Sequence, residues 1–288
     1  MNRLNQHILT FGAVATVLIN AGCAHKDELQ ITPTPPTTEL VKQYAYVGEL
    51  HNQGLQALFN QLTNKNIAIN SANVDAYLKT THNTTETFFT DYHTQHPTVN
   101  LFGTQQGAEQ VFAHQRARLM ATVAAVTGSA NASSSAWSKT SSVSSSADFN
   151  ATVSQAALSD KQKTLLTLVS EASDNATSPT EFSASIELVE TRAAAELPAD
   201  EQPVVFVVTS TAKASAAYWN DHGKEWAALT GNAHKPTAQN RVEKGGINWW
   251  KFALKCAIAD AGGAITGGGV LGAVVGSGIE AANELIGG

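Results

Sequence analysis

Charged residues are scarce in this chain of 288 residues. Lys, Arg, Asp and Glu make up 15% of it, compared with about 25% in typical soluble proteins. The 18 basic residues are outnumbered by 24 acidic ones, and no three basic residues stand in a row. Nucleic-acid binding requires clustered Lys and Arg, so we expect no nucleic-acid partner. Cysteine is also rare, because only Cys23 and Cys256 are present.

The motifs of common catalytic sites are missing as well. The chain has no GxSxG, HExxH, CxxC or P-loop motif. Among the nine histidines only His93 and His96 lie close together, and with Asp91 they could form a weak metal site. HxxH is common by chance in polar segments, so we predict no metal. We therefore expect a non-enzymatic protein without a cofactor; an extracytoplasmic hydrolase would have no recognisable site.

Residues 1–22 have the features of a lipoprotein signal peptide. Arg3 precedes an apolar run, Ile8 to Ile19, which is too short for a comfortable membrane span. The run ends at Ala21-Gly22-Cys23, which resembles the bacterial lipoprotein box, although Asn20 stands where that box prefers Leu. The resemblance implies that Cys23 is acylated and anchors the chain to the outer membrane. The alternative is an ordinary cleaved signal peptide.

The segment after Cys23 is predicted to be a tether over residues 23–38. Its start, AHKDE, is similar to the surface-export signal of Bacteroidetes lipoproteins, and this similarity implies exposure on the cell surface. Residues 31–38, ITPTPPTT, contain three prolines, which favour a stiff, extended spacer.

Residues 39–246 are predicted to form a helical domain. In residues 47–62 the apolar side chains recur at helical spacing, with His51 inside the apolar stripe. We interpret His51 as a hydrogen-bonded core residue in preference to a catalytic or metal-binding one. The run VVFVV, residues 204–208, would suit a strand, but the apolar spacing continues to Trp219 and favours a helix. A Ser-rich stretch at about 127–150, which contains Trp137, is predicted to be a mobile loop.

Two helix starts in this domain carry capping signals. Ser159 to Gln162 is a capping-box pattern, and Ser178 to Glu181 adds a proline in the first turn. These signals predict that helices begin at the two serines.

Three segments resemble a family of uncharacterised Bacteroidetes surface lipoproteins. They are VGELHNQGL at 47–55, SAAYW at 215–219, and the Trp-rich and Gly-rich end from Trp249. The resemblance implies an all-helical fold in the cell envelope. It implies no mechanism, because no activity is known for the family.

The end of the chain, residues 247–288, is predicted to be a Trp-rich and Gly-rich helical hairpin. From Ala261 to Ile279 there are nineteen residues without charge, of which eight are glycine. Gly267, Gly269 and Gly272 match GxGxxG, but the preceding segment has helical spacing where a nucleotide-binding loop needs a strand. That segment places Cys256 on an apolar face, where a thiol behaves as a small hydrophobic group.

Glycines at intervals of four predict close helix packing. Gly263 pairs with Gly267, and Gly268, Gly272 and Gly276 form a glycine zipper. We place the partner helix first within the same chain. The alternative is insertion into a membrane, since nineteen helical residues reach ~28 Å, close to the thickness of a hydrocarbon core. Trp249 and Trp250 could stack on a sugar or an interface, but core packing at a helix start is favoured.

The sequence therefore predicts an all-α, multi-helix bundle with a C-terminal glycine-zipper helical hairpin. The expected function is that of a cell-envelope lipoprotein with a non-enzymatic binding or structural role. The alternative is a membrane-active, bacteriocin-like or pore-related protein that inserts its Gly-rich hairpin. Its expected partners are the outer membrane, through the lipid anchor, and a protein or membrane that contacts the hairpin.

Overall fold

The computed structural model describes residues 36–128, 145–231 and 247–287. Every regular element in these ranges is a helix and none is a strand, which confirms the predicted all-α, multi-helix bundle. The signal peptide, Cys23, Trp137 and most of the Ser-rich stretch lie outside the described residues.

The helices follow one another along the chain as follows: α1 (Pro36–Asn64), α2 (Val74–Gln95), α3 (Gln105–Val126), α5 (Ser145–Gln155), α6 (Asp160–Asn175), α7 (Pro179–Glu196), α8 (Gln202–Ala228), α10 (Trp249–Gly263), the π-helical turn η1 (Ala264–Gly268) and α11 (Gly269–Gly287). Two of them begin earlier than predicted. Helix α1 starts inside the expected tether of 23–38, and α5 starts inside the expected loop of about 127–150. Phe149 and Val153, one turn apart, are both buried. They give α5 an apolar face that packs against the rest of the bundle, so this segment is a helix and not a loop.

The capping signals act at the predicted helix starts. Ser159 and Gln162 form a capping box at the start of α6, and the Ser178 side chain accepts a hydrogen bond from the backbone of Glu181 at the start of α7. A capping box would bring the Glu181 carboxylate to the Ser178 N–H; it accepts a hydrogen bond from the Thr177 N–H at 2.8 Å instead. The serine caps predicted for both helices are confirmed.

Helix α8 contains the whole VVFVV run, which confirms the prediction of a helix there. Val205, Phe206, Val207 and Val208 are all buried, because α8 packs against α1, α7 and α10 on different sides. A helix surrounded in this way needs apolar residues around its circumference. The β-branched run therefore reflects burial on several faces.

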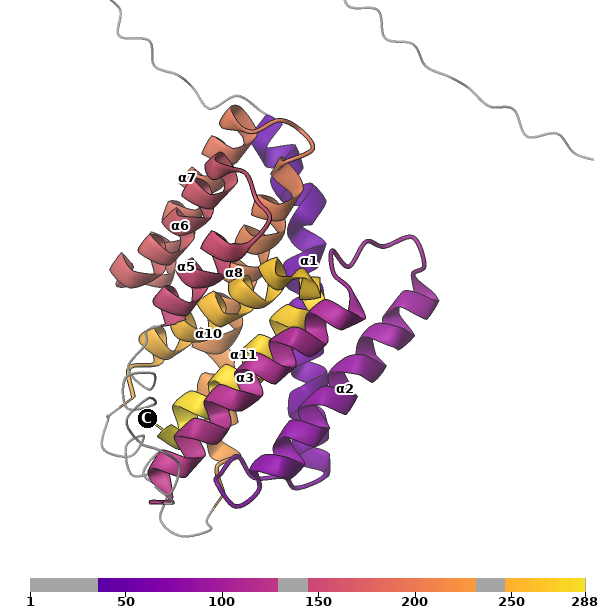
Figure 1. Ribbon diagram of the computed structural model, residues 1–288, viewed down its shortest axis with the longest axis vertical. Coiled ribbons are helices and arrows are strands. Elements are labelled where there is room, and N and C mark those ends of the chain that lie inside the picture. The colour runs from indigo at the N-terminus through magenta and orange to yellow at the C-terminus, as the bar shows by residue number, and fades with distance from the viewer. Residues whose placement is uncertain (1–35, 129–144, 232–246, 288) are drawn as a thin grey trace, which may run out of the picture. The chain divides into compact units, whose positions relative to one another are not determined.

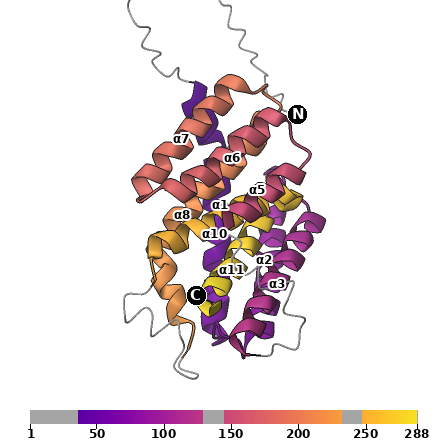
Figure 2. The same ribbon diagram turned by 60° about the vertical axis from the view of Figure 1, so that its left-hand side comes forward.

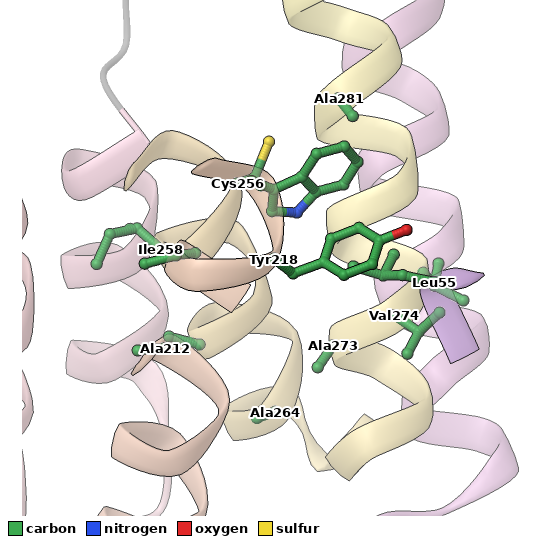
Figure 3. Close-up of a cluster of buried hydrophobic side chains, with 14 of the residues drawn as sticks. Leu55, Ala212, Tyr218, Cys256, Ile258, Ala264, Ala273, Val274 and Ala281 are labelled. Carbon is green, nitrogen blue, oxygen red and sulfur yellow. The ribbon is translucent and has the colours of Figure 1, made fainter. Parts of the chain in front are cut away.

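Helices α10 and α11 form an antiparallel hairpin, residues 249–287, that lies between α8 and α3 (Figure 1, Figure 2). By length and hydropathy this is the one membrane-span candidate among the described residues, and 72% of its apolar window is buried in the bundle. Figure 3 shows its side chains in a common cluster with those of α1 and α8, including Leu55, Ala212, Tyr218, Cys256, Ile258, Ala273 and Val274.

Glycines allow the two helices of the hairpin to touch through their backbones. A Cβ on Gly272 would lie 2.6 Å from the Gly263 carbonyl oxygen, and a Cβ on Gly263 would collide with the Gly272 carbonyl in return. A Cβ on Gly276 would lie 3.0 Å from the Ala259 carbonyl oxygen. The contact runs across the hairpin, as expected for a partner helix in the same chain.

The turn of the hairpin changes the role of two predicted packing glycines. Gly267 has a φ of 84°, so it does not stack with Gly263 on one helix face as the sequence predicted. Its backbone instead fills the space where a Cβ on Gly107 of α3 would lie. A Cβ on Gly268 would meet both the Gly263 carbonyl and the backbone of Ala108. The turn is thus packed against the start of α3.

Replacing two adjacent glycines of α10 by alanine, one at a time, should change the free energy of unfolding in opposite directions. Gly263→Ala should lower the free energy of unfolding by about 1–3 kcal/mol, because its Cβ meets backbone that has no room to move. Gly262→Ala should raise it by up to about 1 kcal/mol, because its nearest neighbour would be Phe149 at 3.8 Å and alanine favours the helix. Urea unfolding followed by circular dichroism measures both. Equal effects would contradict the proposed backbone contact.

Candidate functional site

A cluster of fully buried polar side chains lies at the centre of the bundle. Asp260 of α10 is its hub, and it contacts His51 of α1, Ser215 of α8 and Ser277 of α11; each of the four is 0% exposed. The Asp260 Oδ2 atom lies 3.1 Å from His51 Nε2 and accepts a hydrogen bond of 2.8 Å from the Ser277 hydroxyl. The Ser215 hydroxyl donates to the same oxygen. One carboxylate therefore joins four helices.

A second layer of hydrogen bonds holds this cluster in place. The Trp219 indole N–H donates to the Ser277 hydroxyl at 2.7 Å. His51 Nδ1 is 2.9 Å from the Asn52 side-chain oxygen, and the Asn52 amide donates to the Ala214 carbonyl at 3.1 Å. The prediction that His51 is a hydrogen-bonded core residue is confirmed.

Burial controls the protonation of this region. It raises the pKa of Asp260, against the opposing effects of the His51 ring and then of the Ser215 and Ser277 hydroxyls. One turn earlier on α10, burial and the neighbouring Asp260 charge raise the pKa of the Cys256 thiol well above its ordinary value. Cys256 therefore stays protonated and packs as a small apolar side chain, as predicted (Figure 3).

His, Asp and Ser are the side chains of a hydrolytic triad, but their arrangement here differs. In a triad the serine donates to the histidine, and the carboxylate orients the other ring nitrogen. Here both serines donate to the carboxylate, and all four side chains are closed off from solvent. The cluster is built to connect helices in the core.

Two further buried acids are paired in the same manner. Glu280 of α11 is 1% exposed and lies 3.1 Å from the Arg118 guanidinium of α3. Glu190 of α7 is 2% exposed and lies 2.8 Å from the Lys213 ammonium of α8. Each pair joins two helices, and loss of one partner from such a pair leaves a charge buried without compensation.

A groove of about 590 Å³ opens between α3 and α5, and the end of α10 with η1 forms its floor. We refer to it as the α3–α5 groove. Arg118 crosses it, with its Nε 3.3 Å from the Asp148 carboxylate of α5 and its Nη1 in contact with buried Glu280. Two carboxylates thus compensate the one guanidinium. The remaining polar lining consists of the His114 imidazole and of amide and hydroxyl side chains such as Gln110, Thr152, Gln155 and Thr266.

The tryptophans at the start of α10 pack against the bundle, which is the favoured prediction. The Trp250 indole N–H donates to the Ala176 carbonyl at 3.0 Å. The Trp249 ring packs beside Phe252, with centroids 5.6 Å apart, and covers Gly223.

The other candidate residues are dispersed. His93 and His96 lie exposed at the end of α2, and the His96 ring packs on Tyr92 with centroids 4.5 Å apart. No group of three metal-binding side chains occurs in the ranges that the structure describes. Cys23 lies outside those ranges.

The sequence pattern does not identify Asp260 or Arg118 as site residues. A signal for Asp260 was nevertheless present, since it is a lone acid in the apolar segment LKCAIAD, while His51 is a lone base in an apolar stripe. Arg118 gives no such signal, because its partners Asp148 and Glu280 come from distant helices.

No protein-family model matches the chain, and no curated protein or solved structure matches it either. The resemblance to Bacteroidetes surface lipoproteins therefore stays a prediction.

Removing His51 should destabilise the fold because the buried Asp260 carboxylate then has no basic partner. His51→Leu should lower the free energy of unfolding by about 3–5 kcal/mol, because Asp260 loses its only basic neighbour in the cluster. Adding Asp260→Asn should restore part of that loss, since the amide is neutral and still accepts from Ser215 and Ser277. Denaturant unfolding gives both values. A double variant no more stable than His51→Leu would show that the buried charge is not the cause.

Proposed function

We propose that this chain is a lipid-anchored protein of the bacterial cell envelope, with a non-enzymatic binding or structural role. The observation that carries this proposal is the position of the reactive side chains. His51, Asp260, Ser215 and Cys256 are all inside the core, where they join or fill helices. The acylation box at Cys23 supports the location in the envelope.

The described body has little apolar surface of its own. Val126 and Leu188 are its exposed large hydrophobic side chains, and scattered residues of this kind are ordinary on a protein surface. Attachment to a membrane would therefore come from the acyl chains on Cys23. Two or more such chains are sufficient for stable anchoring.

The α3–α5 groove supports a binding role. Its volume falls within the range of small-molecule sites, and the charge of Arg118 is already compensated by Asp148 and Glu280. Its other hydrogen-bonding groups are the His114 imidazole and amides and hydroxyls such as Gln110, Gln155 and Thr152. These features favour a neutral ligand rich in hydroxyl or amide groups, of which an amino-sugar glycan is the example available in a cell envelope.

Lipidation should depend on Cys23 alone. Cells expressing the wild-type chain and supplied with a fatty-acid probe should label the protein, and Cys23→Ala should not be labelled. The matched control is Cys256→Ala, which should label as wild type because Cys256 is buried and protonated. Labelling of Cys23→Ala at the wild-type level would overturn the proposed anchor.

A groove-filling substitution tests the binding role separately. Titration of the mature chain with chitobiose, a neutral amino-sugar dimer, should shift the NMR signals of the α3–α5 groove. Thr152→Trp should weaken the affinity by about tenfold or more, equivalent to roughly 1.4 kcal/mol, because Thr152 lines the groove. Ser154→Trp is the control, since Ser154 is exposed two residues further on α5, outside the groove lining. Equal affinities, or no shifts in wild type, would contradict this role and leave the anchor untouched.

A further inference from the structure

We propose that the α10–α11 hairpin has a second environment, in which it leaves the bundle and inserts as a unit into a lipid bilayer. This function goes beyond anchoring and groove binding. It rests on the contacts inside the hairpin, on the positions of its charged and aromatic residues, and on the way its tip is held.

The hairpin is held together by contacts that need no other helix. The backbones meet at Gly263 with Gly272 and at Ala259 with Gly276. Ser277 of α11 donates to Asp260 of α10 at 2.8 Å. Close backbone contact through small residues is also how helices associate in membranes, where no hydrophobic effect drives them together. The pair can therefore keep its packing after transfer into lipid.

The charged residues of the hairpin other than Asp260 lie toward its open end. Trp249, Trp250 and Lys251 begin α10, and Lys255 lies 2.8 Å from Glu284 across the hairpin. Tryptophan and lysine are favoured at the membrane–water boundary. The tip, residues 264–268, has no charge. The 15 residues of α11 before Glu284 span ~22 Å, most of the ~30 Å of a hydrocarbon core.

Two acids would move with the hairpin. Glu280 lies one helical turn before Glu284 and so near the open end, where water is close. Asp260 lies deeper, but it keeps its hydrogen bond from Ser277. A charged carboxylate is costly in hydrocarbon, so insertion requires Asp260 to take up a proton as it leaves His51. Its basic neighbour His51 stays behind on α1.

The tip is held by the segment that leads into α3. The Thr104 N–H donates to the Gly267 carbonyl at 2.7 Å, and the Val270 N–H donates to the Leu101 carbonyl at 3.1 Å. Between them Phe102 has a φ of 54°, which is an outlier for a bulky residue. Strain of this kind collects at segments that switch. Release of the hairpin thus requires its separation from α3.

A reversible cross-link between α3 and α11 tests this requirement. A Cβ on Gly287 would lie 3.8 Å from the Cβ of Thr122, which matches the mean separation in disulfides. The test protein is the mature chain with Cys23→Ala, Thr122→Cys and Gly287→Cys. It is mixed, oxidised or reduced, with vesicles of phosphatidylethanolamine and phosphatidylglycerol that contain a self-quenched dye. Protease is then added, and protected fragments are identified by mass spectrometry.

The reduced protein should release the dye and leave a protected fragment that begins near Trp249. The oxidised protein should do neither, and reductant added to the same sample should restore both. Thr122→Cys alone is the control and should behave as the reduced form under either condition; circular dichroism checks that every sample is helical. Equal leakage from oxidised and reduced protein would overturn the proposal. Absence of leakage or of the protected fragment from the reduced protein would overturn it as well.

Discussion

The backbone contact between α10 and α11 is the constraint on which the other packing in this bundle depends. Because Gly263 and Gly272 have no side chains, their backbones occupy space that any other residue would fill. The hairpin is therefore thin enough to lie between α8 on one side and α3 on the other. Each glycine in a helix costs about 1 kcal/mol relative to alanine. The burial that follows from this close approach offsets the summed cost of the several glycines in the hairpin.

The buried acids give the core its specificity. Asp260, Glu280 and Glu190 each meet a basic side chain from another helix. Such pairs add little net stability compared with apolar residues, but a misplaced helix would leave a charge buried without its partner. Apolar and glycine-rich surfaces alone would allow a helix to slide by a turn. Each pair therefore disfavours an arrangement that separates its two partners.

Local features of the fold could be predicted from the sequence. The serine caps at Ser159 and Ser178, the helix through Trp219 and the core position of His51 depend on neighbours within a few turns, and the structure confirms them. The role of Gly267 could not be predicted, because a glycine spacing of four does not distinguish a straight helix from a turn. The α3–α5 groove could not be predicted from the sequence either, since Arg118 meets Asp148 and Glu280 only after three helices have assembled.

The position of the hairpin also sets an order of events during synthesis. Hydrogen bonds such as Thr104 with Gly267, and Thr122 with Asn283, join residues about 160 positions apart, and contacts so distant in sequence form late. A chain made from its N-terminus exposes the apolar faces of α1, α3 and α8 before α10 and α11 exist. The centre of the bundle is thus synthesised after the helices that cover it. Until α10 and α11 have been synthesised, the nascent chain exposes apolar surface of the kind that chaperones bind.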